Sequence, residues 1–262
     1  MAWFWRGLRE GVVTTDYPRR PDPTADRFPA AIRVRGSAAL PAGPETADLC
    51  PTGAITVGDD GTVRLDRGRC ILCRRCVRAR PDLFAPAYGT EIAELRRPAL
   101  TVPPREEDSA ALAAVRGELA ARTARFRRSL HVRHIDAGSD GSEEWEIAAL
   151  TNPVYDIHRL GIFFTASPRH ADLLMITGAG TRGMAPAVRR TYEATARPVA
   201  VLAVGSDACS GGMHAGSYAT LDGVGRTAEV DVWVPGSPPS PFSLLHALLL
   251  AVGRISVHRG TP

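Results

Sequence analysis

Four cysteines with metal-ligand spacing stand in one short window of this chain. Three of them form the run Cys70-x2-Cys73-x2-Cys76, and Cys50 comes earlier, directly before Pro51. The closely spaced triple lets three thiolates face one inorganic core, and thiolates are the soft, anionic ligands that iron–sulfur centres require. The pattern therefore predicts one 4Fe-4S cluster, a centre for electron transfer, held by all four thiolates.

Cys50 is the predicted fourth ligand. In two-cluster bacterial ferredoxins the Cys-Pro that ends one motif ligates the cluster of the other motif, and Cys50-Pro51 has this form. The alternative is a zinc site of four thiolates, but structural zinc sites usually pair two Cys-x2-Cys units instead of using a triple. The positions where a second cluster would need thiolates hold Leu40, Gly43, Thr46 and Arg80. We therefore expect one cluster and no second one.

Composition limits the class of protein. The chain has 262 residues, 44% of them hydrophobic, which is enough for two modest domains with packed cores. Its net charge of +4 comes from Arg residues spread among acidic ones, so we expect no nucleic-acid binding. No apolar run reaches the roughly 18 residues that would span a bilayer, and the charges at Arg6, Arg9 and Glu10 interrupt what would otherwise be a signal-peptide core. Five cysteines without a signal peptide fit a reducing compartment.

The pattern of apolar residues divides the chain into four regions. We expect an N-terminal arm with an interfacial helix, a one-cluster ferredoxin domain, a linker helix and an α/β domain, at residues 1–29, 30–100, 101–128 and 129–262. Asp60-Gly61 between two apolar runs predicts a hairpin in the second region. In the fourth, strands are expected at 160–164, 171–178, 198–205 and 230–235, and helices at 184–196 and 241–252. The fold class is thus an α+β ferredoxin-like domain followed by an α/β domain with a mainly parallel sheet flanked by helices.

Two parts of the chain resemble neighbouring subunits of one kind of complex. Residues Gly11 to Pro18 and Gly68 to Cys76 resemble the polyferredoxin subunit of complex I and of membrane-bound group 4 nickel–iron hydrogenases, which include formate hydrogenlyase. The second half resembles the partner small subunit, of the quinone oxidoreductase B type. The segments that carry this likeness are Arg128 to His131, Asp136 to Ser139, Ser167 to Asp172, Gly211-Gly212 and Val232 to Gly236. The chain therefore looks like a fusion of two adjacent subunits.

The second half departs from the small-subunit pattern where that family binds its own 4Fe-4S cluster. The resemblance places the four ligand positions at Asp140, Glu143, Asp207 and Ser237. None of these is a cysteine, so we expect this cluster to be lost and its site to survive as a polar pocket with Cα atoms within about 10 Å of one another. The pocket would be solvated, proton-sharing or occupied by a hard metal ion. Cys209, two residues beyond the expected ligand position, is interpreted as a core thiol.

The resemblance implies an iron–sulfur electron-transfer subunit, not itself catalytic, in a membrane-associated oxidoreductase complex. Its implied partners are a large hydrogenase-like or quinone oxidoreductase-like subunit and membrane subunits. Trp3, Phe4, Trp5 and Leu8 of the arm would also meet the membrane surface, at the cytoplasmic face. The alternative is a structural or regulatory subunit that scaffolds the complex without passing electrons. A glycine-rich segment, Gly178 to Gly183, could cradle phosphate but is explained equally by a turn between a strand and a helix.

Overall fold

A computed structural model describes residues 2–35, 42–104 and 109–255. Three parts of the sequence predictions fall outside this range. They are Leu40, one of the four positions where a second cluster would need a cysteine, residues 105–108 of the linker helix, and residues 256–262 of the last domain.

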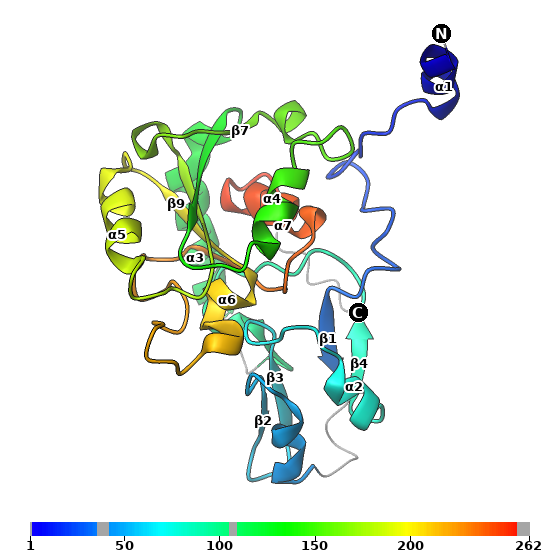
Figure 1. Cartoon of the computed structure of the whole chain (residues 1–262), viewed down its shortest axis with the longest axis vertical. Helices are drawn as coiled ribbons and strands as arrows, with labels where there is room; N and C mark the ends of the chain where they lie inside the picture. The colour runs from blue at the N-terminus through cyan, green and yellow to red at the C-terminus, as the bar shows by residue number, and fades with distance from the viewer. Residues whose placement is uncertain (1, 36–41, 105–108, 256–262) are drawn as a thin grey trace.

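A five-stranded parallel sheet forms the centre of the second half (Figure 1). Its order is β10-β9-β8-β6-β7. The strands are β6 (Leu130–Asp136), β7 (Ile162–Phe164), β8 (Leu173–Thr177), β9 (Ala200–Val204) and β10 (Val232–Val234). All residues of β8 and β9 are buried, because helices cover both faces of a parallel sheet. This arrangement confirms the predicted fold class.

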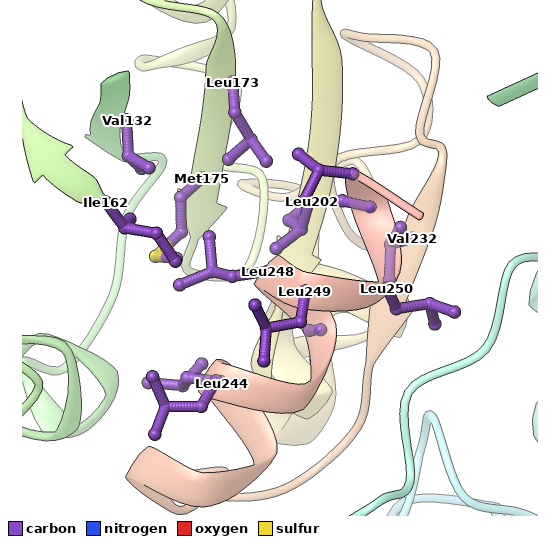
Figure 2. Packing of buried hydrophobic residues seen from close by; sticks show 14 of the residues in the cluster. Val132, Ile162, Leu173, Met175, Leu202, Val232, Leu244, Leu248, Leu249 and Leu250 are labelled. Carbon is purple, nitrogen blue, oxygen red and sulfur yellow. The ribbon is translucent and has the colours of Figure 1, made fainter. Parts of the chain in front are cut away.

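Helices pack on both faces of this sheet. On one face α7 (Pro241–Ala251) is buried along its whole length beside α4 (Ser142–Ala149) and α3 (Ser109–Thr123), and on the other lies α5 (Ala185–Ala194) (Figure 1). Figure 2 shows Leu244, Leu248 and Leu249 of α7 beside side chains from the sheet. Each leucine buried in this way contributes about 1.5–3 kcal/mol to stability. The Ser240 hydroxyl begins the helix by accepting a hydrogen bond from the Ser243 amide at 3.2 Å.

The first half is built from two small antiparallel sheets. One pairs β1 (Ala31–Val34) with β4 (Phe84–Ala87). The other has the order β2-β3-β5, with β2 at Ile55–Val57, β3 at Val63–Asp66 and β5 at Thr101–Val102. The expected hairpin is therefore present. The apolar side chains of the first half form a separate small core. Its members are Ile32, Ala42, Ile55, Val63, Leu65, Cys76, Leu83 and Phe84.

Short helices complete the structure. The remaining α-helices are α1 (Ala2–Glu10), α2 (Arg75–Ala79) and α6 (Gly205–Ser210). The 3-10 helices are η1 (Pro44–Leu49), η2 (Arg97–Leu100), η3 (Ala124–Phe126), η4 (Ile157–Leu160), η5 (Pro168–His170) and η6 (Gly212–His214). No helix in the described ranges is long and apolar enough to cross a bilayer.

The N-terminal helix α1 stands away from the body of the protein (Figure 1). An extended strap connects it to the rest of the chain, and this strap is fixed by the Thr15 amide, which donates to the carbonyl of Val154 at 2.8 Å. Tyr17 follows and is buried, with its hydroxyl donating to the Glu91 carboxylate at 3.0 Å. The segment that follows α1 is therefore attached to the second half of the chain at Thr15.

Truncation of α7 side chains should destabilise the fold. We expect Leu248→Ala, at a site with 0% exposure, to lower the free energy of unfolding by about 2–5 kcal/mol, because the cavity cannot collapse under the sheet. Urea denaturation followed by circular dichroism measures this. Leu8→Ala, on the exposed face of α1, is the matched control and should change it by less than about 0.5 kcal/mol. Equal losses in both variants would contradict this account of the core.

Candidate metal centre

The four predicted ligand cysteines line one cavity of the first half. Cys50, Cys70, Cys73 and Cys76 all face it. Its other walls are mainly apolar and come from Ile32, Leu49, Pro51, Ile55, Leu65, Ile71 and Arg74. Cys76 is buried and Cys73 is exposed, so the cavity lies at the edge of the small core with one thiol at the protein surface. Segments about 20 residues apart in the sequence are thus joined at one place.

The loop between the cysteines has an unusual backbone. Leu72 and Arg74 adopt left-handed conformations, with φ of 56° and 58°, and they stand on either side of Cys73. Such conformations are costly for residues with a side chain, by on the order of 1–2 kcal/mol each. Two of them in a tight loop turn the chain around the cavity. Arg74 also begins α2, whose first turn supplies the buried thiol of Cys76.

Hydrogen-bond donors lie close to the sulfur atoms. The Ala54 amide donates to Cys50 Sγ at 3.3 Å, while Thr52 Oγ1, 3.4 Å from the same sulfur, donates to the Arg69 carbonyl at 2.7 Å. Burial is the main cause that raises the pKa of the Cys70 thiol to about 12. A backbone hydrogen bond from Leu72 lowers this pKa, and the three other thiols raise it. Coordination to a metal deprotonates a thiol outright, and N–H donors then stabilise the resulting anionic sulfur.

All four thiols belong to the lining of one cavity. Within the described part of the chain, no group of three or more His, Cys, Asp or Glu side chains is arranged to hold a metal ion. The donor set, with four thiols on one cavity and N–H groups on sulfur, fits the ligand requirements of a 4Fe-4S cluster.

Three of the four residues of the predicted polar pocket interact. Burial raises the pKa of the Glu143 carboxyl to about 7, and repulsion from Asp207 and Asp140 contributes. Burial and Asp140 also raise the pKa of Asp207, while hydrogen bonds from Ser142 lower that of the exposed Asp140. The three carboxyl groups therefore lie within electrostatic reach of one another. Burial thus makes the Glu143 carboxyl easier to protonate than an exposed glutamate.

Ser237, the fourth predicted member, lines a neighbouring cavity together with Leu72 and Arg74 of the cysteine loop. Its neighbour Gly236 accepts a hydrogen bond from the Ser206 amide at 2.7 Å, next to Asp207. The loops that carry the pocket residues are thus adjacent. Only the three carboxyl groups are linked electrostatically, and the serine lies toward the first half of the chain.

The glycine-rich segment after β8 has a packing role. A Cβ atom on Gly178 would lie 2.5 Å from the backbone of Gly138, and one on Gly180 would lie 2.2 Å from the carbonyl of Gly223. Both glycines also have φ in the left-handed region, at 83° and 68°. Close approach of three loops therefore explains these glycines, as expected for a turn between strand and helix.

Cys209 lies in α6 and is buried, as expected for a core thiol. Burial raises the pKa of this thiol to about 12.

Sequence reasoning missed other features of the site. It expected no helix between the strands at 198–205 and 230–235, where α6 forms, and it gave no role to Ser206 of that helix. No motif marks either one, because their importance comes from packing between distant segments.

Comparison with known proteins concerns the second half. Residues 141–251 match the family described as NADH ubiquinone oxidoreductase, 20 Kd subunit. This agrees with the small-subunit part of the resemblance found in the sequence, and it supports a subunit of an oxidoreductase complex. A chain in the structure of the membrane-bound sulfane sulfur reductase, an archaeal respiratory membrane complex, is 29% identical, with 52% of this chain and 74% of that chain covered and a TM-score of 0.45. The cysteine-rich first half lies outside the matched family segment.

The buried Glu143 should make stability depend on pH. Its pKa rises on folding from 4.5 to about 7, so the folded state binds more protons than the unfolded state between these values. Its stabilising contribution is full below about pH 4.5 and is lost as pH rises through 7. We expect Glu143→Gln to gain on the order of 2 kcal/mol relative to the wild type between pH 5 and 8.

Urea unfolding at several pH values measures this difference. Asp140→Asn is the matched control in the same pocket, because the Asp140 carboxyl is exposed and its pKa shifts downward. It should not reproduce the gain. A Glu143→Gln variant whose stability follows the wild type in parallel across this range would contradict the placement of a protonated carboxyl there.

Proposed function

We propose that this chain is an electron-transfer subunit that holds one 4Fe-4S cluster on Cys50, Cys70, Cys73 and Cys76. The observation that carries the proposal is the cavity lined by all four thiols. A cluster bound there would supply one-electron redox chemistry. The chain's own residues bind it, exclude water with the apolar walls and donate N–H groups to sulfur.

The role of a relay follows from what the second half contains. Asp140, Glu143, Asp207 and Ser237 stand where the small subunits that this half resembles place cluster cysteines. Oxygen donors suit hard cations and not an iron–sulfur core. A second redox centre therefore has to come from a partner. The exposed thiol of Cys73 puts the cluster site at a surface that a partner can approach.

We place the protein in a membrane-associated complex of the complex I and group 4 hydrogenase type. The family match of residues 141–251 supports an oxidoreductase complex. The partners we propose are a large hydrogenase-like or quinone oxidoreductase-like subunit and membrane subunits, with the protein peripheral at the cytoplasmic face.

Helix α1 supports contact with a membrane surface. At helical spacing Phe4 and Leu8 share one face with Trp5, and all three side chains are exposed. On the other side Arg6 donates to Glu10 at 2.7 Å. Aromatic side chains beside an apolar stripe, with arginines facing outward, are typical of helices that lie in the headgroup layer. We propose that α1 lies in the membrane plane.

The second candidate is a structural or regulatory subunit. The absence of cysteines from the polar pocket favours it, because the α/β half has lost the means to pass electrons onward. The two functions differ in one requirement. A relay needs a second redox centre in a partner within tunnelling distance of the cluster, while a scaffold does not.

Metal analysis tests the cluster. Anaerobically purified protein should contain about four iron atoms and four acid-labile sulfides per chain. Cys73→Ser should lose both and loosen residues 30–100 toward protease, because ligation contributes to folding. Cys209→Ser is the matched control, since this thiol is buried in α6, and it should keep the full content. Stoichiometric zinc without iron in the wild type would overturn the proposal.

Membrane binding tests α1. Removal of residues 1–13 should release the protein from the membrane fraction, because the exposed aromatic face is lost. A milder variant, Trp3→Ser with Trp5→Ser, should reduce co-sedimentation with anionic vesicles severalfold. Trp145→Ser, which replaces an equally exposed tryptophan on α4, is the control and should bind as the wild type does. Undiminished sedimentation of the truncated chain would show that another surface anchors it.

A further inference from the structure

The second half of the chain contacts the cluster loop directly. The Ser206 hydroxyl of α6 donates a hydrogen bond to the backbone carbonyl of Cys70 at 2.7 Å. Ser206 is 0% exposed, so its hydroxyl is shielded from water. A side chain of the α/β half thus holds the peptide group of a predicted cluster ligand.

Ser206 is itself held firmly. Its amide donates to the Gly236 carbonyl at 2.7 Å, and its carbonyl accepts from the Ser210 hydroxyl at 3.0 Å. The preceding Gly205 has φ of 92°, and a Cβ atom there would lie 2.3 Å from Glu143 Oε1. The backbone on both sides is therefore fixed, and the Ser206 hydroxyl has a defined position.

A second connection fixes the turn that leads to Cys70. Both terminal nitrogens of Arg97 donate to the two Asp66 oxygens at 2.8 Å, and its Nε donates to the Cys209 carbonyl of α6 at 2.9 Å. Asp66 also accepts from the Gly68 amide at 2.9 Å. This paired geometry is strong and directional. The turn from Asp66 to Cys70 is therefore tied to α6 at both of its ends.

We propose that Ser206 is a positioning residue for the cluster, through which the α/β half sets the geometry and the redox equilibrium of the site. This inference rests on the proposed function, since it concerns the cluster held by Cys70. Outer-shell hydrogen bonds orient ligands and adjust the metal they hold. By donating to the Cys70 carbonyl, the hydroxyl would draw electron density away from the ligand residue and so favour the reduced form of a bound cluster. Without the hydroxyl, the Cys70 carbonyl loses this partner and the ligand peptide is free to shift.

The experiment uses the full chain with its cluster, purified without oxygen. The variants are Ser206→Ala, Ser206→Thr, which keeps the hydroxyl, and Thr123→Val, which removes a buried hydroxyl that bonds only to the Leu119 carbonyl within α3. Iron content, the electron paramagnetic resonance spectrum of the reduced protein and its redox titration are measured for each.

We expect Ser206→Ala to keep its iron, change the spectrum and shift the reduction equilibrium about three- to tenfold toward the oxidised form. A tenfold shift equals about 59 mV for one electron. Ser206→Thr should restore the wild-type value, and Thr123→Val should not depart from it. Loss of iron in Ser206→Ala alone would also support the role of the hydroxyl.

Two results would overturn the inference. One is a Ser206→Ala protein with the same spectrum and potential as Thr123→Val. The other is loss of the cluster in both Ser206→Ala and Ser206→Thr, because packing and not the hydroxyl would then be responsible. Absence of iron from the wild-type protein is a different outcome. It would overturn the proposed function before any variant is compared.

Discussion

Four thiols from two separate segments have to meet at one cavity, and the rest of the structure follows from that requirement. Cys50 ends a short helical segment, while Cys70, Cys73 and Cys76 belong to a loop whose left-handed residues turn it back on itself. The small core beneath this loop is modest, so it has little rigidity of its own. The larger α/β half adds rigidity to the cysteine loop, through Ser206 and through the paired contact of Arg97 with Asp66. A stable sheet thus supports a site that a small domain alone would hold loosely.

In this arrangement the α/β half supports the cysteine site of the first half. Three carboxyl groups now lie in the pocket where the resembling subunits have thiolates, and one of them, Glu143, is buried and easily protonated. The adjoining helix α6 contacts the first half instead. Under the proposed function, the α/β half positions the cysteine site of the first half.

Much of this could be predicted from the sequence, because the signals are local. The apolar runs of β7 to β10 and the Asp60-Gly61 turn follow from periodicity and turn chemistry, and the cysteine spacing indicates the four proposed ligands. Strand β6 was not predicted, since His131, Arg133 and His134 interrupt its apolar pattern. Helix α6 was not predicted either, because it is short and glycines flank it. The contact of Ser206 with Cys70 joins residues 136 positions apart, and one sequence carries no signal for such a pair.

The most direct test of the central claim is a spin count on the wild-type protein. Reduced anaerobically and integrated by electron paramagnetic resonance, the signal of a single cluster should amount to about one spin per chain. Such a result would agree with one redox centre on four thiols and none in the polar pocket. A silent spectrum from protein that carries stoichiometric zinc would contradict the account, and so would a signal of about two interacting spins.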